Sequence, residues 1–190
     1  MKINQVHDDY CINVAIDTIN LNKQAIVFVN TKRSAEALAE RISIQLKKLE
    51  HPRNEELSKK IESVLSRPTV QCKRLGKCTI QNIAFHHSGL ASKQRDMIEE
   101  KFKEGTIKII CATPTLAAGL DMPAFRTIIR DLKRFGQRGM SYIPVLEYAQ
   151  MAGRAGRPKY DKIGESIIIA SDENNKEELS EKYIFGEVEN

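Results

Sequence analysis

The sequence predicts an α/β fold of the doubly wound type, a mostly parallel sheet with helices on both faces. Short apolar runs recur along the chain, as expected for buried parallel strands. Helical patterns separate these runs, and such alternation is typical of parallel sheets. We therefore expect five strands, at residues 25–29, 83–87, 107–111, 126–130 and 166–170.

The helices between the strands are supported by apolar spacing and by end signals. In the clearest one, which follows Asn30-Thr31, one face carries Ala35, Leu38, Ala39, Ile42, Leu46 and Leu49. A second helical stretch covers residues 55–65. A third is expected to start with Ser92 as its cap and to end at Gly105, a left-handed stop. Residues 50–77 are the least regular part, and we expect a surface excursion there.

Size and composition indicate one soluble domain. The 190 residues are 41% hydrophobic and 29% charged, and the four cysteines are widely scattered. Such spacing favours reduced thiols inside a cell. No apolar run approaches the roughly 20 residues that span a membrane, and no signal peptide is evident. We expect a cytoplasmic protein with no membrane partner.

The charge is unevenly distributed. The net charge is +5, but residues 171–190 carry seven acidic and two basic side chains, so the preceding 170 residues hold +10. Five of these positive charges lie within thirteen residues that contain a single acidic residue, Asp131. The five are Arg126, Arg130, Lys133, Arg134 and Arg138. A phosphate backbone would suit this field, although charge runs are often only solvated faces.

Polar residues follow the strands where ligands of such sheets bind. They are Asn30-Thr31, residues 87–89 and residues 113–121. Further on, residues 150–158 read Gln-Met-Ala-Gly-Arg-Ala-Gly-Arg-Pro. On a helical turn Arg154 and Arg157 would point the same way, and arginine suits a developing phosphate charge. The alternative is a basic surface loop.

Four segments carry a family resemblance. Residues 26–31, 85–90, 111–123 and 150–158 resemble, in order, motifs IV, IVa, V and VI of superfamily 2 helicases. The match is closest to the superkiller-type (DExH) branch and its archaeal Hjm-type 3′–5′ DNA helicases. The sequence has no Gly-x-x-x-x-Gly-Lys-[Ser/Thr] P-loop, and Asp172-Glu173 is better interpreted as a helix start. The resemblance therefore implies the second RecA-like domain alone, as a fragment or as half of a split enzyme.

The resemblance also implies roles for individual residues. ATP and Mg²⁺ would be held mainly by the absent first RecA-like domain, with Arg154 and Arg157 as catalytic arginine fingers. The implied ATP-binding residues are Gln150, Gly153, Asp121 and Gly119, and Gly119 also matches a family position that touches the nucleic-acid backbone. The implied nucleic-acid contacts are Thr31, Ser88, Gly89, Thr113 and Thr115. Thr31 could equally cap the following helix. His86 and His87 lack a third ligand at metal-binding spacing.

A hairpin is expected between motifs V and VI. Gly136 and Gly139 would centre it, with residues 142–145 pairing against residues 129–133. In Hjm-type helicases a hairpin here separates the strands. Its nucleic-acid contacts would be the basic Lys133, Arg134 and Arg138 and the stacking side chains Phe135, Met140 and Tyr142. The alternative is a plain surface hairpin.

These inferences predict three parts: a lead-in helix at 1–22, a second RecA-like domain at 23–170 and an acidic helix or tail at 171–190. The expected function is the second motor domain of an ATP-dependent DNA helicase. Its partners would be single-stranded or forked DNA, the first RecA-like domain, and winged-helix and ratchet domains. The alternatives are an RNA helicase of the same branch and a nucleic-acid-binding module without an ATPase role.

Overall fold

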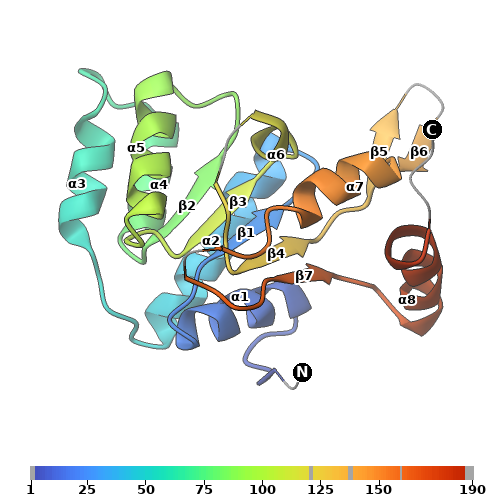
Figure 1. Ribbon diagram of the computed structural model, residues 1–190. Coiled ribbons are helices and arrows are strands. Elements are labelled where there is room, and N and C mark those ends of the chain that lie inside the picture. The colour runs from blue at the N-terminus through green and yellow to red at the C-terminus, as the bar shows by residue number, and fades with distance from the viewer. Residues whose placement is uncertain (1–2, 120–121, 137–138, 159, 187–190) are drawn as a thin grey trace.

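A five-stranded parallel sheet forms the centre of the protein in the computed structural model, which describes residues 3–119, 122–136, 139–158 and 160–186 (Figure 1). The strand order is β2-β3-β1-β4-β7. The register places Val27 between Cys111 and Ile128. The predicted mostly parallel sheet is confirmed. Its strands are β1 (Ala25–Phe28), β2 (Ile83–His86), β3 (Ile109–Ala112), β4 (Arg126–Ile129) and β7 (Glu165–Ile168).

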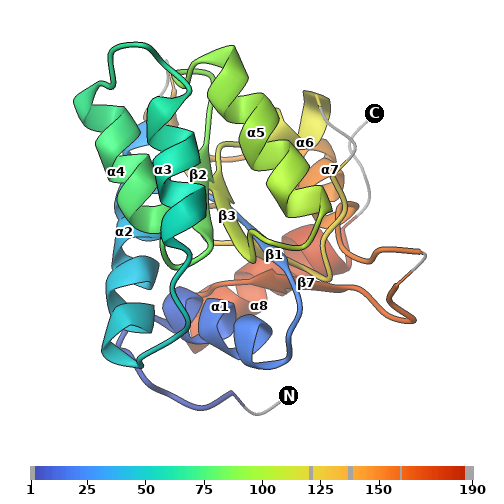
Figure 2. The ribbon, with the colours of Figure 1, turned by 90° about the vertical axis from the view of Figure 1, so that its left-hand side faces the viewer.

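Helices cover both faces of the sheet, as predicted. One face carries α1 (Tyr10–Asn20), α2 (Lys32–Lys48) and α4 (Val70–Thr79), and α3 (Glu55–Ser63) packs outside α4. The other face carries α5 (Ser92–Lys103), α6 (Thr115–Gly119) and α7 (Val145–Ala152). Figure 2 shows the two helical layers on either side of the sheet. This arrangement follows from right-handed crossovers between parallel strands.

The core follows the predicted pattern along β1 and α2. Every residue of β1 is buried, as in a strand covered on both faces. The predicted apolar face of α2 is buried from Ala35 to Leu46, but Leu49 lies beyond the helix and is half exposed. Gly105 has a φ of 83° just after α5, so the predicted left-handed stop is confirmed.

Two local predictions were wrong. Ser92 is the first residue of α5 rather than its cap, because Ala91 occupies the N-cap position and makes no side-chain cap bond. Residues 50–77 are not a surface excursion, since α3 and most of α4 lie there. Leu57, Ile61 and Leu75 from these helices are buried in the core. Their apolar spacing is short and interrupted by charged residues, which conceals it in the sequence.

An antiparallel hairpin projects between β4 and α7. It consists of β5 (Lys133–Gly136) and β6 (Gly139–Tyr142), with Lys133 opposite Tyr142. The predicted pairing of residues 129–133 with residues 142–145 was placed too far from the turn and shares only Lys133 and Tyr142 with the observed strands, because Ile129 already belongs to β4 and Val145 to α7. One further bond, from Ile143 N to Leu132 O at 2.9 Å, extends the hairpin base.

The acidic end of the chain forms α8 (Glu173–Leu179) and a π-helical turn, η1 (Ser180–Ile184). Asp172 caps α8 by accepting a bond from Asn175 N at 2.8 Å, as its interpretation as a helix start required. Tyr183 of η1 is buried and donates to Ile143 O at 2.7 Å, which ties this segment to the base of the hairpin. No helix in the described part of the chain has the length and apolarity to cross a membrane.

Candidate nucleic-acid groove and arginine cluster

An open groove of about 710 Å³ lies at the carboxyl end of the sheet. The loops after β1, β2 and β3 form one side, and the hairpin and the start of α7 form the other. Doubly wound sheets bind ligands at this end. Six residues predicted to contact nucleic acid or nucleotide line it together: Thr31, Ser88, Thr113, Thr115, Arg134 and Gln150.

Hydroxyl groups on the groove wall already have local roles. Thr31 caps α2, accepting from Ser34 N at 3.0 Å, while its own hydroxyl donates to Ser34 Oγ at 2.8 Å. The capping alternative therefore holds for Thr31, which still lines the groove. The Thr113 and Thr115 hydroxyls lie 3.0 Å apart, and Ser88 is exposed in the turn after β2. Such hydroxyls are suitable partners for phosphate oxygens.

The predicted glycines differ in their surroundings. A Cβ on Gly89 would lie 3.0 Å from His87 Nδ1, so the turn after β2 packs closely against that ring. Gly153 ends α7, and a Cβ there would meet Ala149 O at 3.1 Å. Gly119 is exposed, with open space around its Cα. Gly119 is therefore the one of the three whose backbone a ligand could approach freely.

The groove also has lining residues that were not among the predicted contacts. Pro114, Pro144 and the exposed Leu146 give it an apolar wall. Asn30 joins β1 to the hairpin, since its side-chain amide donates to Lys133 O and its backbone N–H donates to Asp131 Oδ2 at 3.1 Å. The sequence had already marked Asn30 by its position directly after β1, whereas Leu146 resembles any residue of an amphipathic helix.

The hairpin presents its apolar side chains at the tip. Phe135 and Met140 lie opposite each other and are 81% and 65% exposed. Two large apolar side chains paired in solvent suit stacking on a base or wedging between bases. Arg134 faces the groove and contacts Glu147 of α7 at 2.8 Å.

Tyr142 lies at the base of the hairpin rather than at its tip. Its hydroxyl donates to Glu178 of α8 at 2.7 Å, and its ring packs edge-on against Tyr183 with centroids 6.4 Å apart. Lys133 Nζ lies 4.3 Å from the centroid of the same ring. The structure thus gives Tyr142 an anchoring position between the hairpin and α8, unlike the wedge expected from the sequence.

Arg154 and Arg157 follow α7, which ends at Ala152. The predicted helical turn carrying both was wrong, because the chain turns at Gly153 and approaches β4, where Ala124 N donates to Arg154 O at 2.9 Å. Arg154 Nε donates to Ala117 O of α6 at 3.1 Å. Arg157 instead binds Asp161 and Gln24, so the two guanidinium groups have different partners.

Part of the predicted basic field is not available to a phosphate backbone. Arg126 is 1% exposed, and its guanidinium binds Asp17 at 2.6 Å and Glu165. Arg130 lies 3.6 Å from Asp9 and is partly buried. Counting Arg126 in a field suited to a phosphate backbone was therefore wrong: it opens a central strand and holds α1 and β7 against β4.

The adjacent histidines are paired with carboxylates. His86 Nε2 lies 2.9 Å from Glu99, and His87 Nε2 lies 3.0 Å from Glu36. Burial lowers the pKa of both rings below the usual value, against the opposing effect of the carboxylates. Among the described residues, no cluster of three or more His, Cys, Asp or Glu side chains is arranged to hold a metal ion.

Two predicted residues, Asp121 and Arg138, lie outside the described part of the chain. A different carboxylate, Asp161, accompanies Arg157. Its position four residues after Arg157 is the spacing of side-chain neighbours on a helix, and that spacing could have indicated it in the sequence.

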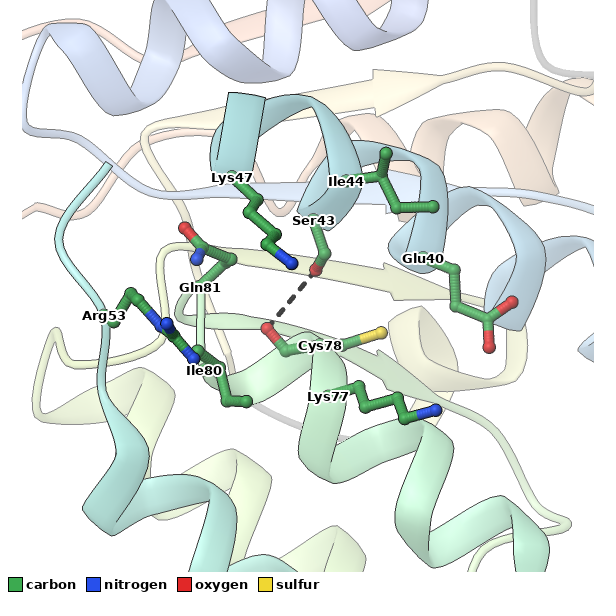
Figure 3. Close-up of a pocket in the computed structure, with 9 residues that line it drawn as sticks. All are labelled: Glu40, Ser43, Ile44, Lys47, Arg53, Lys77, Cys78, Ile80 and Gln81. Carbon is green, nitrogen blue, oxygen red and sulfur yellow. Dashed lines mark hydrogen bonds between the residues drawn. The ribbon is translucent and has the colours of Figure 1, made fainter. Parts of the chain in front are cut away.

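A second pocket, of about 490 Å³, lies between α2 and α4 (Figure 3). Ser43, Ile44 and Lys47 approach it from α2, while Lys77 and Cys78 approach it from α4. Ser43 donates to Cys78 O at 3.3 Å, which joins the two helices. None of its lining residues belongs to the four helicase-like segments, so it does not compete with the groove as the functional site.

Comparisons with known proteins agree with this geometry. Residues 57–159 match the family model described as helicase conserved C-terminal domain. The chain is 43% identical over 190 residues to the "ATP-dependent DNA helicase Hel308" of Methanocella arvoryzae, covering 98% of this chain and 26% of that protein. It is 44% identical over 174 residues to the protein of that name in Pyrococcus horikoshii, covering 91% of this chain and 24% of that protein.

A third relative with the same name, from Methanococcus vannielii, is 42% identical over 167 residues, with 87% of this chain and 22% of that protein covered. The chain therefore spans about a quarter of the length of these relatives. The family model covers more than half of this chain. The chain belongs to the helicase conserved C-terminal domain family, in its superfamily 2, Hel308-type branch.

Proposed function

We propose that this chain is the second motor domain of an ATP-dependent DNA helicase that moves 3′ to 5′ along a single strand. The observation that carries the proposal is the groove at the carboxyl end of the sheet. It gathers Thr31, Ser88, Thr113 and Gln150, one from each helicase-like segment or its immediate border, although they are far apart in the sequence. The parallel strands bring these loops to one edge of the sheet, and the polar side chains that line the edge are of the kind that binds a phosphate backbone.

The groove would hold the strand chiefly through its backbone. Hydroxyls of Ser88, Thr113 and Thr115 and the open backbone at Gly119 suit phosphate oxygens, as does the guanidinium of Arg134. The apolar wall formed by Pro144 and Leu146 suits sugars and base faces. The tip of the hairpin, Phe135 and Met140, would then separate the strands, in keeping with its exposure.

The nucleotide would lie between this domain and a first RecA-like domain. Bound ATP with Mg²⁺ supplies the phosphoanhydride whose hydrolysis drives movement, and the first domain would hold most of it. Arg154 and Arg157 would contribute positive charge toward the transferred phosphoryl group, where an arginine finger accelerates hydrolysis by about 10³–10⁵-fold. Gly153, Gly119 and Asp121 keep the ATP-facing roles that the resemblance implies, and Gln150 would link groove to nucleotide.

DNA is preferred over RNA as the substrate because the similar proteins are named DNA helicases. Phosphate contacts by themselves carry no such preference. An RNA helicase of the same branch is the alternative. The first RecA-like domain and the winged-helix and ratchet domains are proposed as parts of the same enzyme. Within this chain, we propose a lead-in helix up to residue 22, a motor domain from residue 23 to residue 170, and an acidic tail after it.

The arginines provide the test. In the complete enzyme, Arg154→Ala and Arg157→Ala should each lower kcat for DNA-stimulated ATP hydrolysis by roughly 10³-fold with little effect on ATP binding. The matched control is Arg53→Ala, which removes a half-exposed arginine at the α2–α4 pocket and should leave kcat unchanged. The isolated 190-residue chain should hydrolyse no ATP.

Two results would contradict the proposal. One is near-normal kcat in both arginine variants with a loss of affinity alone, which would make the pair a binding element. The other is steady ATP turnover by the isolated chain that Arg157→Ala abolishes. A nucleic-acid-binding module without an ATPase role would bind single strands normally in both variants and would show no ATPase defect in any assembly.

A further inference from the structure

Asp161 lies between two cations at the amino end of the sheet. Its Oδ2 accepts from Arg157 Nε at 2.7 Å and its Oδ1 accepts from Arg157 Nη2 at 3.2 Å. Lys23 Nζ donates to the same Oδ1 at 2.7 Å. The Asp161 side chain is 1% exposed. A two-point contact between carboxylate and guanidinium fixes the orientation of the guanidinium as well as its position.

Gln24 fixes Arg157 from a third direction. Its Oε1 accepts from Arg157 Nη1 at 2.7 Å. Its Nε2 donates to Phe102 O at 2.6 Å and to Ile107 O at 2.7 Å, so the amide oxygen must face the arginine. A guanidinium has five N–H groups, and these hydrogen bonds use three. Two therefore have no partner among the described residues.

Two roles for this cluster are conceivable. Asp161 could restrain Arg157 until ATP binds, or it could hold Arg157 in its working orientation. Releasing Arg157 would leave a buried carboxylate with Lys23 alone, and breaking a buried pair costs about 10²–10⁴-fold in population. The two cations lower the pKa of Asp161 to about 2, so protonation does not relieve that cost near neutral pH. The holding role is favoured.

The position of Arg157 allows it to act without leaving Asp161. Arg157 borders an open cavity of about 530 Å³ together with Met122 and Pro123, which belong to the motif V-like segment. Tyr160 adds an exposed ring whose centroid lies 5.4 Å from Arg157 Cζ. The two unused N–H groups are therefore close to space that a ligand can enter.

We infer that Asp161 is the positioning residue of Arg157, and that its buried carboxylate, aided by Gln24, sets the direction in which the guanidinium meets a phosphate. The inference rests on the proposed function, since it concerns how the proposed arginine finger is aimed. It differs from a merely structural role in one respect: disturbing Asp161 should affect turnover more than it affects folding or ATP binding.

The experiment measures kcat and KM for ATP in the complete enzyme, with melting temperature as the folding readout. Asp161→Asn keeps the side-chain shape but replaces one acceptor oxygen by an N–H₂ group, which cannot complete the two-point contact. We expect kcat to fall by about 10–100-fold, as for displaced catalytic groups, with KM within about twofold. In the double variant with Arg157→Ala, kcat should be no lower than with Arg157→Ala alone.

Lys23→Met is the matched control, because it removes the other cation from the same carboxylate and leaves Arg157 bound. It should lower the melting temperature and keep kcat within about twofold. If Asp161→Asn does not fold, Asp161→Glu retains the charge but shifts the carboxylate, and kcat should still fall. Parental kcat in the folded Asp161 variant would overturn the inference, and so would a raised kcat, which indicates a restraint. Parental kcat in Arg157→Ala would instead overturn the proposed arginine finger.

Discussion

Polar side chains at the two ends of the central sheet differ in their exposure and in how firmly they are held. At the carboxyl end, Ser88 and Thr115 stand exposed along an open groove, and Arg134 has Glu147 as its ion-pair partner. At the amino end, Arg126 and Arg157 are each held by carboxylates, with the Arg126 side chain 2% exposed and the Arg157 side chain 19% exposed. Arginines that lie close together in the sequence thus serve different purposes.

This difference shows that not every charged residue counted in a sequence is accessible to a binding partner in the folded protein. A groove that must accept successive segments of a strand benefits from accessible, adjustable contacts. A group that must meet one phosphate in one direction benefits from fixed partners, because positioning before the reaction lowers the barrier. Buried ion pairs such as those of Arg126 fix the orientation of the guanidinium group but keep it from contacting a binding partner.

The contrast is tested most severely at Arg126. The double substitution Asp17→Asn and Glu165→Gln leaves the buried guanidinium without these two carboxylates, and we expect a loss of about 3–5 kcal/mol in the free energy of unfolding. Arg126→Met should cost less, since Asp17 and Glu165 are 25% and 34% exposed and water can reach them. Urea unfolding of the chain measures both. A reversed order would show that Arg126 is not the buried member of the network.

The hairpin sharpens the contrast between tip and base. In the complete enzyme, Phe135→Ala and Met140→Ala should impair unwinding of a forked duplex and spare DNA-stimulated ATPase, because stacking contributes about 1–3 kcal/mol per base. Tyr142→Phe removes only the hydroxyl that binds Glu178 and should leave unwinding close to normal. Equal loss of ATPase and unwinding in the tip variants would assign the hairpin to the motor instead.

The ion pairs of Asp161 should make the free energy of unfolding depend on pH. Its folded pKa of about 2 lies below the ordinary value of 3.8, so its contribution is present above about pH 4 and is lost as pH falls toward 2. The shift corresponds to about 2 kcal/mol. Asp161→Asn should therefore be less stable than the parent at pH 7, and this difference should shrink by about half at pH 3 and further as the pH falls to 2. A stability difference independent of pH would mean that the charge is unimportant.

The smallest expected effect concerns salt. Replacing Lys133 and Arg134 by Gln should reduce the slope of log affinity against log salt concentration for single-stranded DNA by about 0.7 for each phosphate that the protein no longer neutralises. Arg126→Met should leave the slope unchanged, because Arg126 is buried. Titrating a fluorescent oligonucleotide with each protein at several salt concentrations gives the slope for the parent, for the Lys133 and Arg134 double variant, and for Arg126→Met. A slope that depends on Arg126 would remove the distinction between the two ends of the sheet.

Much of the fold was determined by the sequence itself. Apolar runs such as residues 25–28 and the repeating face of α2 specify their elements locally, because burial on both faces of a strand and on one face of a helix leaves a clear periodicity. Asp172 and Gly105 likewise carry their end signals in their own chemistry. The four helicase-like segments, read in order, were enough to predict the family.

Only the tertiary structure decided which polar residues meet. Arg126 pairs with Asp17, 109 positions away, and Arg157 with Gln24, 133 positions away, and no local pattern encodes such contacts. The same holds for Tyr142, which the hydroxyl contact with Glu178 places at the base of the hairpin. Periodicity in the sequence predicts whether a side chain is buried, because the preference for burial depends on the apolar character of that residue itself. The direction of a charged group depends instead on partners that folding brings together from distant parts of the chain.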